Sequence, residues 1–351
     1  MRKFLMIILA IVVVMAGFTA CGGNGGGGGN QPANGGDPPE DTGQTFRLVI
    51  GSTVQSESAS GIALYNYFKP YIEEHSGGRI AVEVHTNSVL GSDREMFEGL
   101  QIGTIQANFG PLSVLALFDS DMNVTDLPFL FRDKEHAYYH LDGAFGDRLA
   151  QNLPNVGMRI LAYAENAFRN ISNNARPIHT LEDLQGLDIR TMEAPMHMAI
   201  YSSFGINPTP LAFAEVYTAL QQGLVDGQDN GVVLTYTARF FEVQRYYTFT
   251  EHLYAAIAFV VSEQWYQSLP ADLRDVVRRG SKFAAENQRR LNTQMENDLI
   301  IVMEEAGMVV HRMAQSERDR LREASLPVWD QFADTITSDI FEMALAIRDE
   351  N

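Results

Sequence analysis

The sequence predicts an α/β protein whose parallel sheets are covered by helices on both faces. Strand-type and helix-type segments alternate along most of the chain after residue 45, which is the pattern of such folds. Roughly 300 residues follow that point, which is more than one domain usually holds. The chain has one cysteine and therefore no internal disulfide, so we expect the hydrophobic core to stabilise the fold.

In the first half of this body, apolar periodicity together with glycine and proline stop signals delimits the predicted elements. Residues 46–52 have the sequence FRLVIGS, which predicts a strand that ends in a glycine turn. Further strands are predicted at 79–85, 105–109 and 157–163, and helices at 59–75, 93–102 and 133–152.

The second half continues the same alternation. Strands are predicted at 187–190, 225–228, 246–250 and 256–261, and helices at 195–204, 213–222 and 316–347. Residues 270–305 have helix-type composition that is interrupted only by Gly280. A helix of that length is long for a globular protein, and we expect it to connect two parts of the molecule.

The N-terminal segment has the features of a lipoprotein signal. Arg2 and Lys3 precede an apolar run, and small residues lead to Cys21. The apolar run is shorter than the roughly 20 residues that a spanning helix needs, which disfavours a transmembrane anchor. We expect residues 1–20 to be a signal peptide, Cys21 to carry the lipid, and the Gly-rich linker 21–45 to be a flexible tether.

The net charge excludes some partners. The chain carries 26 basic and 44 acidic side chains, and removal of the signal peptide takes away only basic ones. Such an acidic body is not suited to bind nucleic acid or anionic lipid surfaces. Because the overall charge repels an anionic ligand, local arginines must supply the attraction for one.

Two arginines and an asparagine lie where a ligand is expected. In open α/β sheets, ligands bind beyond the carboxyl ends of strands. Arg190 ends one predicted strand, Asn230 closely follows another, and Arg169 lies just past the strand that ends near residue 163. A guanidinium matches the edge of a carboxylate, and an asparagine amide both donates and accepts. The chain has no nucleophile motif, metal cluster or phosphate loop, so we predict an anion pocket without cofactor or catalysis.

Five segments carry a resemblance to a known family, and the third and fourth are the most specific. They are LGSDREMFEGLQIGTIQ, DLPFLFRDKEHA, RPIHTLEDLQGLDIR, PTPLAFAEVYTALQQGLVDGQDN and LPADLRDVV. Together they resemble the DctP-type solute-binding proteins of TRAP transporters, the tripartite ATP-independent periplasmic importers of organic acids. The resemblance extends from about residue 46 to residue 351 without large gaps.

The resemblance implies a two-lobe fold like that of type II periplasmic binding proteins, with the ligand held in a cleft. Lobe I would comprise residues 46–165 and about 256–295, and lobe II residues 166–255 and about 296–351. The long helix would connect the lobes near the hinge.

The resemblance also assigns the site residues. It implies that Arg190 pairs with a ligand carboxylate and that Arg169, Asn230 and Phe213 contact the ligand. Glu95 is placed near the cleft by analogy. Phe213 would provide an apolar wall for a carbon chain or a sugar face.

The implied protein is a monomeric, extracytoplasmic, lipid-anchored receptor, not an enzyme, that delivers a small organic acid to TRAP membrane subunits. A sugar acid such as a uronate or aldonate is favoured slightly by the nearby Asn173 and Asn174, and a C4-dicarboxylate or keto acid is the close alternative. Pro111 stands where sialic-acid-binding members carry an acid, which disfavours sialic acid. Gly231 replaces a usual proline and is expected to loosen the turn that holds Asn230.

Two other functional classes remain open, namely a ligand-binding sensory lipoprotein and an enzyme on a two-lobe scaffold. His136 and His140 have the i, i+4 spacing of metal ligands on a helix. No third ligand is evident beyond Glu135 or Asp142. We therefore interpret the two histidines as a surface pair and predict no metal.

Overall fold

The computed structural model describes residues 44–350, so the predictions for the signal peptide, for Cys21 and for most of the linker lie outside the described residues. The strands are β1 (Phe46–Gly51), β2 (Ile80–His85), β3 (Ala107–Pro111), β4 (Met158–Asn173), β5 (Asp188–Thr191), β6 (Asn207–Pro210), β7 (Gly227–Asn230), β8 (Tyr246–Ser262) and β9 (Val309–Arg312). The α-helices are α1 (Ala59–Ala63), α2 (Lys69–His75), α3 (Asp93–Ile102), α4 (Leu112–Leu115), α5 (Lys134–Leu141), α6 (Ala144–Ala150), α7 (Pro195–Ser203), α8 (Val216–Gln221), α9 (Val232–Thr237), α10 (Glu263–Ser268), α11 (Ala271–Glu305), α12 (Gln315–Ala333) and α13 (Ser338–Asp349). A π-helical turn, η1 (Leu64–Phe68), joins α1 to α2, and the 3₁₀ turns are η2 (Ser120–Asp126), η3 (Leu153–Val156), η4 (Leu181–Leu184), η5 (Phe213–Glu215) and η6 (Phe240–Glu242). In this part of the chain, no helix has the length and apolar character needed to span a membrane.

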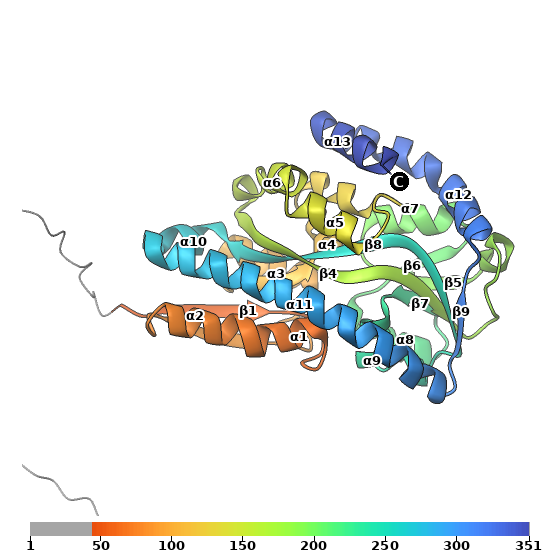
Figure 1. Ribbon diagram of the computed structural model, residues 1–351, viewed down its shortest axis with the longest axis horizontal. Helices are drawn as coiled ribbons and strands as arrows, with labels where there is room; N and C mark the ends of the chain where they lie inside the picture. The colour runs from red at the N-terminus through yellow and green to blue at the C-terminus, as the bar shows by residue number, and fades with distance from the viewer. Residues whose placement is uncertain (1–43, 351) are drawn as a thin grey trace, which may run out of the picture. The chain divides into compact units, whose positions relative to one another are not determined.

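A mixed sheet of nine strands organises these elements (Figure 1). Its order is β2-β1-β3-β8-β4-β7-β5-β6, and β9 pairs with β8. β1 runs parallel to β2 and β3, and β5 runs parallel to β6 and β7. The long strands β4 and β8 run antiparallel between these two parallel blocks. The block of β1, β2 and β3 joins the β4–β8 pair because β3 pairs with β8. The block of β5, β6 and β7 joins the other side of this pair because β7 pairs with β4.

The predicted α/β class is confirmed, but the expectation of purely parallel sheets is wrong. The strands predicted at 246–250 and 256–261 are one strand, β8, and the strand predicted at 157–163 continues as β4 to Asn173. β4 and β8 pair with each other although they lie far apart in the sequence. Because no short hairpin turn joins them, the sequence contains no local signal for this antiparallel pairing. Arg169 consequently lies within β4, and Asn230 is the last residue of β7.

Two predicted helices are each divided in two. The segment predicted at 133–152 forms α5 and α6, with Gly143 at the start of α6. The segment predicted at 316–347 forms α12 and α13. Thr337 lies in the second break, where its amide and hydroxyl donate to the Asp121 carboxylate at 2.7 and 2.9 Å. These bonds to a distant residue favour a helix start that periodicity alone does not reveal.

The long helix is confirmed as α11, which has 35 residues. It packs against α1, β4 and α9, so it spans elements of both parallel blocks. A Cβ atom at Gly280 would lie 2.5 Å from Cδ1 of Ile72 and 2.9 Å from Cδ1 of Tyr71. Glycine at this position therefore permits the close approach of α11 to α2.

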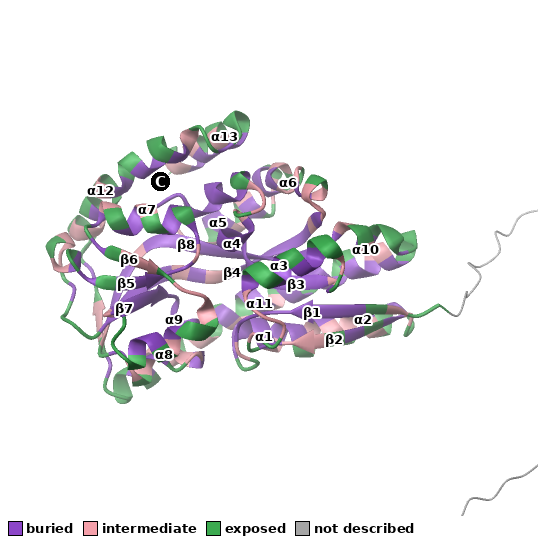
Figure 2. Ribbon diagram, turned by 180° about the vertical axis from the view of Figure 1, so that it is seen from behind, coloured by how far each residue is buried: buried purple, intermediate pink, exposed green. Residues whose placement is uncertain are grey.

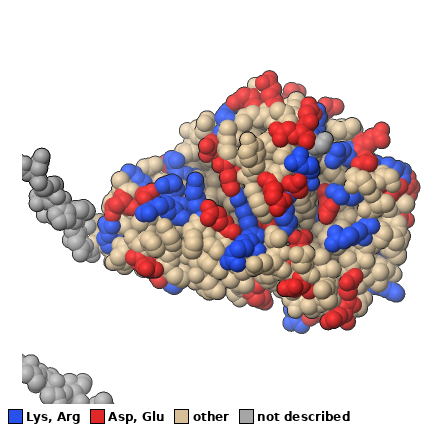
Figure 3. All heavy atoms as spheres, viewed as in Figure 1, with Lys and Arg blue, Asp and Glu red and all other residues tan. Residues whose placement is uncertain are grey.

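The core lies on the central strands, and exposed residues concentrate on the outer faces of helices such as α10 and α12 (Figure 2). One large cluster packs α3, α7 and α12 around the sheet, and a second packs α2, α10 and α11 against β1 and β3. On the face drawn in Figure 3, acidic and basic side chains are interspersed. Several form ion pairs between elements, as Arg289 does with Asp142 at 2.5 Å.

Candidate ligand-binding site

A cavity of about 600 Å³ lies at the carboxyl ends of strands from both parallel blocks. Residues that follow β1 line it, as do residues at the ends of β3, β5 and β7, which is where open α/β sheets bind ligands. Four of the predicted ligand residues, Arg169, Arg190, Asn230 and Phe213, come together in its lining.

Arg190 is a buried cation that forms no ion pair with an acidic side chain of the described residues. It lies in β5, and only 2% of its surface is exposed. Its Nε and Nη2 both donate to the carbonyl of Leu211, at 3.0 and 2.6 Å, which fixes the plane of the guanidinium. Among residues 44–350, no acidic side chain forms an ion pair with it. Burial lowers the pKa of Arg190 to about 10, so the group remains charged at neutral pH.

Arg169 is equally buried, but its charge is compensated within the fold. Its Nε forms an ion pair with the Asp229 carboxylate, and its Nη2 donates to the Asp229 carbonyl at 2.6 Å. Burial acts to lower the pKa of Arg169, yet the Asp229 charge outweighs it and the pKa is raised. Burial likewise opposes the charge of Asp229, and Arg169 still holds the pKa of that carboxyl below its usual range. The pair joins β4 to β7 at the back of the cavity.

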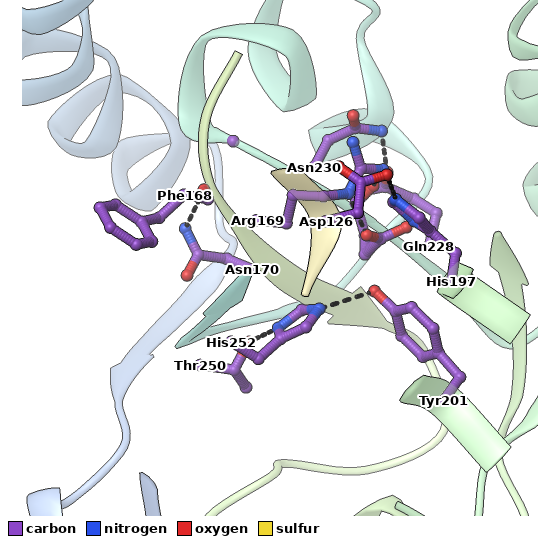
Figure 4. A network of polar contacts seen from close by, with 12 residues as sticks. Asp126, Phe168, Arg169, Asn170, His197, Tyr201, Gln228, Asn230, Thr250 and His252 are labelled. Atoms are coloured by element: carbon purple, nitrogen blue, oxygen red, sulfur yellow. Dashed lines mark hydrogen bonds and ion pairs between the residues drawn. The ribbon is translucent and has the colours of Figure 1, made fainter. Parts of the chain in front are cut away.

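Asn230 belongs to a chain of amide hydrogen bonds on β7. Its Nδ2 donates to Oε1 of Gln228 at 2.6 Å, and Nε2 of Gln228 donates to Oγ of Ser172 at 2.8 Å. Figure 4 shows Asn230 and Gln228 beside Arg169. Because Nδ2 already has a partner, the amide is held in one orientation.

Phe213 lines the cavity, and Gly231 follows Asn230 directly in the chain but is not part of the lining. Phe213 begins η5 and packs edge to face on Phe240, with ring centroids 5.9 Å apart. Gly231 has a φ of −68°, which a proline could adopt. A Cβ atom there would lie 2.5 Å from the carbonyl oxygen of Asn166, so the glycine permits a closer approach of these two segments.

Glu95 lies outside the cavity lining. Its carboxylate accepts from the amide and hydroxyl of Ser92, at 2.7 and 2.9 Å, and so forms the capping box of α3. This cap fixes the start of the helix and leaves Asp93 in its first turn, where it does line the cavity.

The cavity lining also contains two acids that were not predicted from the sequence, Asp93 and Glu193. Asp93 is 8% exposed and accepts from the Thr53 hydroxyl at 3.1 Å. Burial raises the pKa of Asp93 to about 7. Asp93 directly follows the helix cap, and its hydroxyl partner Thr53 is distant in the sequence, so no local signal placed this acid in the cavity.

A buried polar layer supports the strands behind Arg169 (Figure 4). His197 Nε2 lies 3.1 Å from Oδ2 of Asp126, and the Tyr201 hydroxyl lies 3.0 Å from Nε2 of His252. Burial lowers the pKa of His252 to about 3, which keeps its imidazole neutral. Neither histidine lines the cavity. The cavity thus contains a buried cation without an ion pair in the described chain, and a hydrogen-bonded polar layer lies behind its lining, which is an arrangement suited to a solute-binding protein.

Comparison with known proteins gives the family. Residues 50–335 match the model of DctP, the bacterial extracellular solute-binding proteins of family 7, and the chain belongs to this family. A solute-binding protein of Verminephrobacter eiseniae is 41% identical over 242 residues, which cover 68% of this chain and 71% of the relative. The 2,3-diketo-L-gulonate-binding periplasmic protein YiaO of Escherichia coli is 35% identical over 243 residues, which cover 69% of this chain and 74% of the relative.

Solved structures agree with this assignment. The sugar acid binding protein DctPAm of Advenella mimigardefordensis, in complex with galactonate, has a TM-score of 0.84 at 29% identity and covers 88% of this chain and 99% of its own. A TRAP periplasmic solute-binding protein from Polaromonas sp. JS666, bound to D-erythronate, has a TM-score of 0.82 at 33% identity. The match covers 86% of this chain and 98% of that protein. The predicted family and the two-lobe binding-protein fold are confirmed.

Proposed function

We propose that this protein is the extracytoplasmic receptor of a TRAP importer and that it holds a small hydroxylated organic acid by pairing the ligand carboxylate with Arg190. The observation that carries this proposal is the buried guanidinium of Arg190, which lines the cavity and has no ion pair within the described chain. A buried, uncompensated charge is costly, and an anionic ligand removes that cost. Planar paired donors suit a carboxylate edge.

The buried acid Asp93 in the cavity lining supports a hydroxylated monoacid over a plain dicarboxylate. Above neutral pH, Asp93 is an acceptor-only carboxylate with a single hydroxyl donor, Thr53. A ligand hydroxyl can donate to it, whereas a second ligand carboxylate would be repelled. Relatives with bound galactonate and D-erythronate are consistent with this chemistry, although another, from Sulfurospirillum deleyianum, holds succinate.

The proposed ligand class predicts different pH dependences for the two kinds of acid. An aldonate should bind with nearly constant affinity between pH 6 and 8, because its hydroxyls can donate to ionised Asp93 or accept from the protonated form. Binding of succinate should weaken as the pH rises through about 7, where Asp93 becomes charged. Calorimetric titration of both acids against wild type and Asp93→Asn provides the measurement. The asparagine variant should abolish the pH dependence for succinate, and equal profiles for both acids in wild type would contradict the assignment of Asp93.

The lobe boundaries proposed from the resemblance coincide with irregularities in the two long strands. The register of β4 and β8 shifts at three places between Ile160 and Ile171. One of them lies between Glu165 and Phe168, where Ala167 has a φ of 60°. On the opposite strand, Glu251 has a φ of 46°. Interruptions of the ladder at this point support lobe borders near residues 165 and 255, with the cavity between the lobes.

Anchoring at Cys21 is the other part of the proposal, and it rests on the signal-like sequence and the single thiol. Cys21→Ser should yield soluble protein with unchanged ligand affinity, because the lipid would be attached outside the folded body. Fractionation of cells followed by immunoblotting measures the shift. If the serine variant stayed with washed membranes as wild type does, a transmembrane or other anchor would replace this assignment.

A further inference from the structure

We propose that His136, His140 and Glu350 form a binding site for a divalent transition-metal cation, with zinc as the preferred ion. The sequence offered no evident third ligand beyond Glu135 or Asp142, whereas the fold brings the Glu350 carboxylate to the two histidines from a distant part of the chain. This site is separate from the ligand cavity.

The fold brings the three side chains together from two elements. Asp133 caps α5 by accepting from the His136 amide at 2.7 Å, and the helix then presents His136 and His140 on one face. Glu350 directly follows α13, and its carbonyl accepts from Nη1 of Arg132 at 3.0 Å. Figures 1 and 2 both draw α5 and α13 on the same side of the sheet.

The three donor atoms form a nearly equilateral triangle. Nε2 of His136 and Nε2 of His140 are 3.0 Å apart, and they lie 3.1 and 3.3 Å from Oε2 of Glu350. Zinc–nitrogen and zinc–oxygen bonds of about 2.0–2.2 Å give ligand separations of about 3.3–3.5 Å on one face of a tetrahedron. Adjustments of a few tenths of an ångström would complete three sites of a tetrahedral ion.

The positions of the protons in this cluster favour binding of a cation, but they also limit the affinity of the site for it. The Arg132 amide donates to Nδ1 of His136 at 3.2 Å, which places the proton of a neutral ring on Nε2. That one proton then faces two acceptors, Nε2 of His140 and the Glu350 carboxylate, which also lie close to each other. Coordination by His136 moves the proton to Nδ1 and releases the Arg132 amide. Because the lost hydrogen bond is long, we expect a penalty of about tenfold in affinity and a dissociation constant on the order of 1–10 µM.

The surroundings leave room for a fourth ligand and a path of entry. The Glu350 side chain is 51% exposed, whereas the His136 side chain is 3% exposed. A groove of about 730 Å³ between α5, α6 and α13 has His140 and Glu350 in its lining. Water can therefore complete the coordination shell from the groove. Two imidazoles and one carboxylate suit zinc and other first-row transition metals, whereas magnesium and calcium prefer oxygen ligands alone.

The test is a zinc titration of the tag-free, EDTA-treated mature protein, followed by calorimetry and by melting curves. We expect one zinc per chain and, at a hundredfold excess over the dissociation constant, a melting temperature about 4 °C higher. Glu350→Gln and His140→Ala should each weaken binding at least about tenfold. Both side chains are partly exposed, so these variants should fold without zinc as wild type does.

A second histidine pair provides the matched control. Nδ1 of His179 lies 3.1 Å from Nε2 of His311, and this pair belongs to no three-ligand group in the described chain. His311→Ala should leave zinc affinity and the melting shift unchanged. Absence of saturable binding by wild type, or equal losses in His311→Ala and Glu350→Gln, would overturn the proposal. Cobalt(II) as a second probe should give the intense visible absorption of four-coordinate sites, and a six-coordinate spectrum would also count against it.

Discussion

Replacement of Arg190 by alanine should weaken binding of the organic acid by about a hundred- to several-thousand-fold. The variant removes the one arginine of the cavity lining that forms no ion pair within the described chain, and it leaves the ligand carboxylate buried without its partner. Folding should be nearly unaffected, because the loss of an uncompensated buried charge offsets the loss of the bonds to Leu211. Calorimetric titration of the acid, with melting curves for each variant, measures both quantities.

Two further variants separate geometry from charge. Arg190→Lys keeps the charge but loses the paired donors, so it should also bind poorly. Arg94→Ala removes the same charge from the residue beside Asp93, where the exposed side chain pairs with Glu98 outside the cavity lining. It should bind within about twofold of wild type. Binding by Arg190→Ala within threefold of wild type would show that the ligand carboxylate lies elsewhere.

Local sequence signals predicted much of the fold. Helix α3 has the predicted bounds because its cap, its apolar face and Gly103 all lie within a few residues of one another. The strand that carries Arg190 was also predicted within one residue. The long strands were not predicted at full length, because β4 and β8 are buried along both faces and show no period that marks their ends.

The candidate site was also predicted only in part, because local sequence signals find some of its residues and not others. Arg190 is the second-last residue of β5 and Asn230 is the last residue of β7, so the rule for strand ends finds them. Asp229 was missed because its importance lies in the neighbouring strand: Ile171 is its partner in the register of β4 and β7, and its carboxylate reaches Arg169. Glu350 was missed because its contact with His136 joins residues more than 200 positions apart in the sequence.

The pairing of Arg169 with Asp229 leads to the largest expected change in stability. Both side chains are almost fully buried, and Oδ1 of Asp229 has no further hydrogen-bond partner in the described structure. Asp229→Asn keeps the shape and removes the charge, so Arg169 is left as an unpaired cation in the interior. The free energy of unfolding should fall by about 3–5 kcal/mol. Because the pKa of Asp229 is depressed in the folded state, the loss should be constant from about pH 5 to pH 8. It should shrink progressively as the pH falls below about 4, the ordinary pKa of an aspartate, because the unfolded wild-type chain takes up a proton there.

A double-mutant cycle distinguishes the ion pair from a simple loss of packing. Arg169→Met alone should be about as damaging as Asp229→Asn, because it leaves the carboxylate buried without a cation. The double variant should be less unstable than the sum of the two by at least about 2 kcal/mol, since neither charge remains. Urea unfolding of the four proteins gives the coupling energy. Additivity within about 0.5 kcal/mol would mean that the two charges do not stabilise each other, and Arg169 would then be a second uncompensated cation available to the ligand.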